Sequence, residues 1–276
     1  MATYIATGSF EDTVAAVQAA LGEAGMVVAT LDHAANAASV GQQLRPTTLV
    51  IGGNSRAGTP VMAAEQTAGV DLPQKYLVWE DEAGTVRVGY NSAEYLAARA
   101  GIDVDDPALD ALRTGSARIA SAAAGTDTPS ADGTLPEGER TLAAGDDYLL
   151  ERQSDTSVAE SIDRYLAAFA ARDLQSVATI DHAANAATID AELAPTRVTI
   201  VGNPAVGTAL IQASQTFGID LPIRYLAWQD DDGVHVGHPD IRVLAQRHGA
   251  AGVEDTLTMI EGATDMFDAI AAGESP

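Results

Sequence analysis

The segment VATLDHAANAA at residues 28–38 returns 149 residues later as VATIDHAANAA at residues 177–187. Between residues 26 and 81, 29 of the 56 positions aligned at this offset are identical. The second copy then loses one residue after Gly233, which aligns with Gly84, and the match continues more weakly. Self-similarity on this scale predicts two copies of one domain of about 125 residues and excludes a solenoid of short repeats.

The boundary between the copies is predicted from composition. Residues 125–145 are rich in glycine, threonine, serine, proline and aspartate and show no apolar periodicity, which is typical of a flexible linker. We therefore expect two domains at residues 1–124 and 147–276, joined by a linker at residues 125–146.

Each copy shows the same order of predicted elements. Ser9 carries a capping signal ahead of apolar residues at helical spacing, and Ser157 carries the stronger equivalent. Pro60 is expected at the first position of its helix, where a missing N–H is harmless. In the first copy we expect strands at 3–7, 26–31, 47–51, 75–80 and 85–90, and helices at 34–40, 59–68, 93–100 and 107–123. This order predicts an α+β domain with a mainly antiparallel sheet.

The net charge is the most unusual property of the composition. The chain contains 39 acidic and 15 basic residues, a net charge of −24, and Lys75 is its single lysine. Such a surface repels phosphate groups, so we expect no nucleic-acid partner and no membrane partner. The composition is typical of proteins from salt-loving archaea, in which molar salt screens the repulsion between carboxylates. We therefore expect the fold to loosen below about 0.5 M salt.

Several classes of chemistry and location are excluded or disfavoured. The sequence has no cysteine, which excludes disulfides, thiolate metal sites, iron–sulfur clusters and cysteine nucleophiles. The N-terminus has neither a basic region nor a long apolar core, and no apolar run approaches the roughly 20 residues that span a bilayer. We expect a cytoplasmic protein.

Five motifs occur in a fixed order along the chain. They are DHAANA at 32–37, LRPTT at 44–48, DLP at 71–73, WED at 79–81 and, in the second copy, GNPAVGT at 202–208. With these motifs the chain resembles the domain of unknown function family 302, in two copies. The resemblance implies a TATA-binding-protein-like fold, β-α-β(4)-α, without an established activity. It also implies that single-copy members pair, so we expect an intrachain pseudo-dimer; a homo-oligomer beyond that stays open.

The two copies depart from each other at some motif positions. The first copy has Ser55 where the second has Pro204, and the second has Ala194 where the first has Arg45. A site that uses these positions is expected to differ between the halves.

His33 and His182 are the first candidate site residues. Each follows a strand and an aspartate at a predicted helix start, and Asn36 and Asn185 follow on the same helical face. A helix N-terminus favours neutral imidazole, which suits a metal ligand or a general base. The competing structural interpretation is a histidine that caps the helix and orders the turn by hydrogen bonds. If the copies pair, the two histidines can converge on one site.

The glycine-containing stretch after the buried strand of each copy is the second candidate. Free backbone N–H groups at a helix start can bind an anion, but the spacing is not that of a Walker loop, so nucleotide hydrolysis is not expected. The structural alternative is a glycine turn followed by a threonine cap. The candidate ligand-binding residues are Asn54, Gly58 and Thr59 in the first copy and Asn203, Gly207 and Thr208 in the second.

These patterns favour a binding or accessory protein with a small-ligand site near the two Asp-His-Ala-Ala-Asn motifs. Two alternatives stay open: a metal- or haem-binding protein that uses His33 and His182 as ligands, and a purely structural interaction module. An enzyme is disfavoured because no paired carboxylates and no nucleophile with a base are visible, so we assign no catalytic residue.

Overall fold

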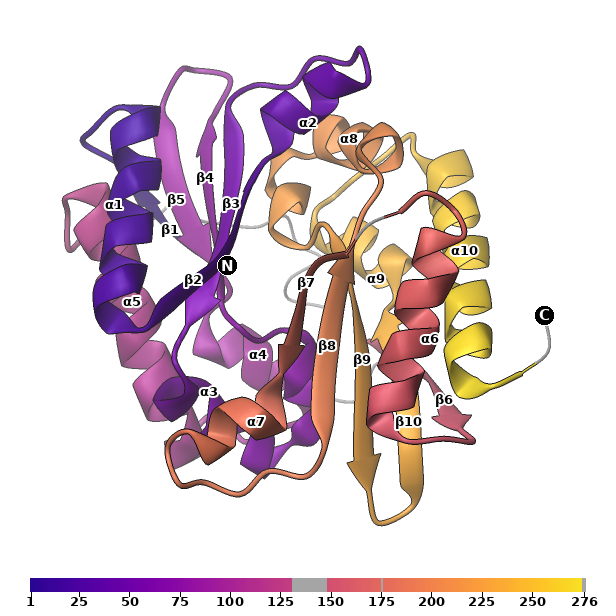
Figure 1. Ribbon diagram of the computed structural model, residues 1–276. Coiled ribbons are helices and arrows are strands. Elements are labelled where there is room, and N and C mark those ends of the chain that lie inside the picture. Colours follow the sequence, from indigo (N-terminus) through magenta and orange to yellow (C-terminus); the bar gives the residue numbers. More distant parts are fainter. Residues whose placement is uncertain (131–147, 175, 275–276) are drawn as a thin grey trace.

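The computed structural model describes residues 1–130, 148–174 and 176–274, and it contains two halves of the same architecture (Figure 1). The first half contains β1 (Ala2–Ile5), α1 (Phe10–Ala24), β2 (Met26–Asp32), α2 (His33–Ser39), β3 (Thr47–Gly53), α3 (Ser55–Ala64), η1 (Gln66–Val70), β4 (Lys75–Glu80), β5 (Val86–Tyr90), α4 (Ala93–Ala100), η2 (Pro107–Leu109) and α5 (Asp110–Ala124). The second half contains β6 (Leu149–Ser154), α6 (Val158–Ala170), β7 (Ser176–Asp181), α7 (His182–Ala187), β8 (Thr196–Val201), α8 (Pro204–Ala213), η4 (Gln215–Ile219), β9 (Ile223–Asp230), β10 (Gly233–Pro239), α9 (Ile241–Arg247) and α10 (Glu254–Ala272).

Each half contains one five-stranded antiparallel sheet with the same strand order. The order is β1-β5-β4-β3-β2 in the first half and β6-β10-β9-β8-β7 in the second. In the first sheet Tyr76 lies opposite Val50 of β3 and Tyr90 of β5, and in the second sheet Tyr225 lies opposite Thr199 of β8. The predicted α+β fold with two copies of one domain is therefore confirmed.

The two long helices of each half cover one face of its own sheet. α1 and α5 cover the face that carries Val50 and Tyr76, and α6 and α10 cover the equivalent face around Tyr225 (Figure 1). Because successive strand residues point to opposite faces, the neighbours of these residues face away from the helices.

The other faces of the two sheets contribute to a hydrophobic core that both halves share. This core joins Leu77 and Trp79 of the first sheet to Leu226 and Trp228 of the second. The short segment η1 packs on β8 and β9 of the other half, and η4 packs on β3 and β4. A sheet must bury its apolar face against another element, and here that element comes from the other copy. The expected intrachain pseudo-dimer is what the structure contains.

The helix after the buried strand begins earlier than the sequence pattern predicts. α3 starts at Ser55 because Asn54 caps it, accepting a hydrogen bond from the Ala57 N–H at 2.9 Å. Pro60 therefore lies inside the helix, and its predicted placement at the first position is wrong. The cap provided by Asn54 outweighs the positional preference of proline. In α8 Pro204 does occupy the first position, after the cap Asn203.

Most of the predicted linker lies outside the described residues, since residues 131–147 are not described. Before this segment, Gly125 ends α5 with a left-handed φ of 69°, and the Ser130 N–H donates to the Thr3 carbonyl at 2.7 Å. The domain limits at 1–124 and 147–276 stay a prediction. Among the helices that are described, none has the length and apolar character needed to cross a membrane.

Candidate functional site

His33 and His182 occupy the first position of α2 and α7. Asp32 caps α2 by accepting a hydrogen bond from the Ala35 N–H at 2.8 Å, and Asp181 caps α7 in the same way. Since the aspartates cap the helices, the interpretation of the histidines as caps is wrong. The histidine side chains reach the other half of the chain instead.

Each histidine donates a hydrogen bond to a backbone carbonyl across the interface between the halves. His33 Nε2 donates to the Gly218 carbonyl of η4 at 3.0 Å, and His182 Nε2 donates to the Gly69 carbonyl of η1 at 3.1 Å. Burial lowers the pKa of both imidazoles, to about 4 for His182. Because a carbonyl only accepts, the proton lies on Nε2 and the neutral ring keeps its lone pair on Nδ1.

There is little room for a side chain at the two residues that accept these hydrogen bonds. A Cβ on Gly69 would lie 3.2 Å from Thr196 Cγ2, and a Cβ on Gly218 would lie 3.1 Å from Leu77 Cδ1 and 3.2 Å from His33 Cδ2. In a close-packed interior such an approach forces the neighbours apart. Glycine therefore lets η1 and η4 lie directly against the opposite sheet.

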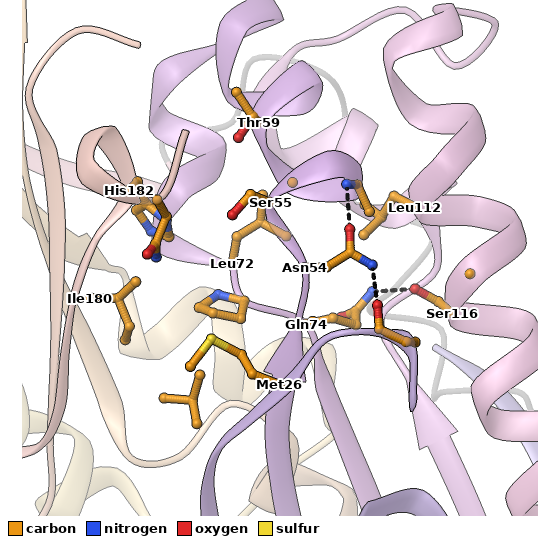
Figure 2. A pocket seen from close by; sticks show the side chains of 18 of the residues that line it. Met26, Asn54, Ser55, Thr59, Leu72, Gln74, Leu112, Ser116, Ile180 and His182 are labelled. Carbon is orange, nitrogen blue, oxygen red and sulfur yellow. Dashed lines mark hydrogen bonds between the residues drawn. The ribbon is translucent and has the colours of Figure 1, made fainter. Parts of the chain in front are cut away.

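One pocket at this interface lies beside the start of α3, and we call it the Gly58 pocket. It has a volume of about 330 Å³. Figure 2 shows His182 and Ile180, from the second half, on one side and Asn54, Gln74 and Ser116, from the first half, on the other. The predicted site residues that line it are Asn54, Gly58, Thr59, His182 and Asn185.

The second pocket lies beside the start of α8, and we call it the Gly207 pocket. It has a volume of about 830 Å³. α2 packs on α8 just as α7 packs on α3, so the pairing of the halves builds both pockets in the same way. The predicted site residues that line it are His33, Asn36, Asn203, Gly207 and Thr208.

The ten predicted site residues thus form two groups of five, and each group mixes the halves. The glycine-containing stretch of one half lies beside the histidine and asparagine of the other. The sequence predicts that these motifs belong to one site, but it does not indicate that each pocket takes one motif from each half, an arrangement we call the exchange between halves. That exchange follows from the pseudo-dimer.

His33 and His182 do not converge on one site, because they line different pockets. The Nε2 atom of each ring is already hydrogen-bonded to a carbonyl. Within the described ranges, no group of three or more histidine, cysteine, aspartate or glutamate side chains is arranged to hold a metal ion. The metal and haem alternatives gain no support from this arrangement.

Equivalent polar groups in the two pockets are not equally engaged. The amide of Asn54 is used at both ends, since Nδ2 also donates to the Ala24 carbonyl at 2.8 Å. The hydroxyl of Thr59 is buried and has no hydrogen-bond partner in the described part of the chain. The equivalent hydroxyl of Thr208 donates to the Pro204 carbonyl at 2.7 Å. Thr59 therefore has a hydroxyl without a partner in the described part of the chain, and it lies beside the Gly58 pocket.

A buried cluster of charges, which was not predicted from the sequence, lies between the halves. Asp220 accepts hydrogen bonds from Lys75 Nζ at 2.8 Å, from Arg247 Nη1 at 2.6 Å and from His248 Nε2 at 2.8 Å. All four side chains are at most 5% exposed. Burial by itself raises the pKa of Asp220, but Arg247, Lys75 and His248 hold it well below its ordinary value.

The cluster has matching members in both halves. Asp71 is the counterpart of Asp220 and accepts from Lys75 Nζ at 3.3 Å and from Arg99 Nη1 at 2.9 Å. Arg224, the counterpart of Lys75, donates to the Pro73 carbonyl at 3.1 Å. The repeated Asp-Leu-Pro motif, followed each time by a cation four residues after its aspartate, was the available sequence signal.

Comparison with known proteins supports the repeat and leaves the activity open. The model of the family described as "Domain of unknown function DUF302" matches residues 2–121 and 150–267. A crystal structure of an uncharacterised DUF302 protein from Bacillus stearothermophilus is similar at 13% identity and a TM-score of 0.43, covering 46% of this chain and 99% of that one.

Curated relatives of this chain carry a functional name. Over 132 residues the chain is 39% identical to proteins named fluoride-specific ion channel FluC 1 from Brucella suis biovar 1 and Brucella abortus biovar 1. The match covers 47% of this chain and 52% and 48% of those proteins. The chain therefore spans about half the length of the curated relatives it matches.

Proposed function

The chain belongs to the DUF302 family and contains two copies of its domain, and on this premise we propose that it is a binding protein that takes up small molecules in the Gly58 and Gly207 pockets. One observation carries the proposal. All ten residues chosen from the sequence line these two pockets, five in each, where the halves meet. Largely preformed concave sites with a few polar groups among apolar walls are typical of ligand sites.

The positions of exposed apolar side chains support the same function. Met26, 56% exposed, lines the Gly58 pocket, and Met259, 54% exposed, lines the Gly207 pocket. Large exposed apolar side chains gathered at a concavity mark interaction sites more often than scattered ones do. Methionine also adapts its shape to different ligands.

Filling both pockets is expected to abolish binding of an apolar probe. A Cβ on Gly58 or Gly207 meets a leucine methyl at 3.6 or 3.7 Å, which is ordinary contact, so leucine extends into each pocket without a backbone clash. Leucine also favours the helix by about 1 kcal/mol over glycine. We expect the double variant Gly58→Leu/Gly207→Leu to stay folded and to lose the fluorescence of bound N-phenyl-1-naphthylamine.

The matched control is Gly22→Leu/Gly262→Leu. Both glycines lie in helices, and a Cβ at either has no neighbour within 4 Å. This control is expected to bind the probe like the wild type. Undiminished binding by the pocket-filling variant, or no binding by the wild type, would contradict the proposed function.

A second candidate function comes from the relatives named fluoride-specific ion channels. We propose that this domain responds to a small anion such as fluoride at Arg99. The Nε and Nη2 atoms of Arg99 are buried without a hydrogen-bond partner in the described ranges, and the side chain is 1% exposed. Buried guanidinium N–H groups normally have hydrogen-bond partners. The Nε–Nη2 edge of Arg99 presents two parallel N–H groups, an arrangement that suits an anion.

Replacing chloride with fluoride at constant ionic strength tests the second function. The wild type is expected to gain thermal stability from a bound anion, and Arg99→Lys, which keeps the charge but removes the planar edge, is expected to gain less. Fluoride also raises the thermal stability of proteins in general, so the quantity to compare is the shift of the thermal midpoint in the wild type against the shift in Arg99→Lys. Equal midpoint shifts in both would contradict an anion site at Arg99.

A further inference from the structure

We infer that the two pockets bind different classes of molecule, and that the Gly207 pocket takes the larger and more apolar ligand, a neutral aromatic or branched aliphatic compound. This inference rests on the proposed function, because it assigns ligand chemistry to the same pockets. The two pockets differ at equivalent positions of the two halves.

The floors of the pockets differ at one aligned position. Gln74 precedes Lys75 at the start of β4, and Ile223 precedes Arg224 at the start of β9. Gln74 Nε2 donates to the Asn91 carbonyl at 2.8 Å and to Ser116 Oγ at 3.2 Å, and Figure 2 shows the second of these bonds. Ile223 offers no polar side-chain atom. The floor is therefore polar in the Gly58 pocket and apolar in the Gly207 pocket.

The helical walls differ in the same direction. Arg118 and Ile119 of α5 line the Gly58 pocket, and Met266 and Phe267 occupy the aligned positions of α10 in the Gly207 pocket. On this helix an arginine and a β-branched residue are thus replaced by a flexible thioether and a large ring, and the charged groups that line the Gly207 pocket, Arg172 and Asp173, come from the segment after α6. Such side chains bind apolar molecules by dispersion and area burial and adapt to their shape.

The two pockets also differ in the hydrogen bonding of their threonine hydroxyls and in their volume. Thr208 and Thr264 use their hydroxyls within their own helices, donating to the Pro204 and Glu261 carbonyls. Thr59 leaves its hydroxyl without a partner in the described part of the chain. The Gly207 pocket is also larger, about 830 Å³ against about 330 Å³. The smaller pocket suits a compact molecule with a hydrogen-bonding group, and the larger suits an apolar skeleton.

N-phenyl-1-naphthylamine, a neutral aromatic probe, tests this assignment by fluorescence titration. We expect one probe per wild-type chain. Ile223→Gln and Met266→Arg each place in the Gly207 pocket the residue that the Gly58 pocket has, and each is expected to weaken probe binding tenfold or more. Leu150→Arg adds the same charge on β6, outside both pockets, and is expected to leave binding within twofold. Equal thermal midpoints for the variants and the wild type establish that the fold is intact.

Comparing the two single glycine variants separates the inference from the proposed function. Gly207→Leu is expected to lower probe affinity far more than Gly58→Leu does. Two equivalent sites per chain, or equal losses from the two glycine variants, would overturn the assignment while leaving the binding function in place. A wild type that binds no probe, or a double glycine variant that binds it fully, would overturn both.

Discussion

Replacing Asp220 with asparagine is expected to lower the free energy of unfolding by about 3 to 5 kcal/mol, because it removes one partner from a buried ion pair. The carboxylate is the shared acceptor for Lys75, Arg247 and His248, all at 2.6 to 2.8 Å. An asparagine has one acceptor oxygen and no charge, so it leaves buried cations without compensation. The size of the expected effect comes from those stranded charges.

The control for Asp220→Asn must remove the same charge elsewhere. The chain carries a net charge of −24, so loss of any carboxylate relieves some repulsion. Asp265, whose side chain is 69% exposed in its pair with Arg152, provides that control. Asp265→Asn is expected to change stability by less than about 1 kcal/mol. Urea unfolding at fixed salt measures both, with unchanged slopes confirming a comparable transition.

A second substitution distinguishes a charge effect from a packing effect. Lys75→Met removes the cation whose ammonium group lies 2.8 Å from Asp220. In that background, Asp220→Asn is expected to cost less than in the wild type, because one stranded charge is absent. The prediction would be wrong if Asp220→Asn lowered the free energy of unfolding equally in the wild type and in Lys75→Met. It would also be wrong if Asp220→Asn lowered the free energy of unfolding no more than Asp265→Asn does.

The repeat made much of the fold accessible from the sequence. Two copies of each motif, 149 residues apart up to Gly84 and 148 residues apart after it, support each other, so the strand at residues 47–51 and the helix at residues 93–100 are each predicted twice. The helix at residues 93–100 has the predicted bounds, with Ser92 as its cap and Gly101 in a left-handed conformation at its end. Local signals of this kind act within a few residues and can be read from one chain.

The interface between the halves could not be read in the same way. The partners of His33 and His182 are Gly218 and Gly69, which lie 185 and 113 residues away in sequence. A repeat predicts that two copies pair but does not say which surfaces meet. The exchange that forms both pockets is a property of the packed sheets and not of any local pattern.

The buried charges were missed for a different reason. Lys75 is the first residue of β4. Lysine side chains are mostly exposed in folded proteins, so an exposed side chain was the default expectation here. Lys75 is buried because Asp71 and Asp220, one from each half, lie beside it. The single lysine among 39 acidic residues was the feature of the sequence that could have drawn attention to this position.

Acid is expected to weaken the interface between the halves because its histidines are held neutral. Burial lowers the pKa of His182 to about 4, with the Gly69 carbonyl and Asp181 opposing the shift and Arg224 adding to it. The unfolded chain binds the proton near pH 6.5, while the folded chain resists it until about pH 4. The stabilisation is therefore complete above pH 6.5 and is lost as the pH falls toward 4. A fall in pKa from 6.5 to about 4 corresponds to about 3 kcal/mol.

The contribution of His182 is isolated by comparing His182→Gln with the wild type at each pH. Glutamine can still donate to the Gly69 carbonyl but does not titrate. We expect the wild type to be more stable near pH 7 and this advantage to shrink by about 3 kcal/mol between pH 7 and pH 4. Protonation of surface carboxylates acts on both proteins and cancels in the difference.

A variant without a titratable group supplies the control for this titration. Gln66 donates across the same interface, to Thr196 Oγ1 at 2.6 Å and to the Pro195 carbonyl at 3.1 Å. Gln66→Ala is expected to destabilise the fold by an amount that stays constant from pH 7 to pH 4. If His182→Gln behaved in the same way, the imidazole would bind its proton equally well in the folded and the unfolded chain. Burial would then not hold His182 neutral, and the predicted loss of stability in acid would be wrong.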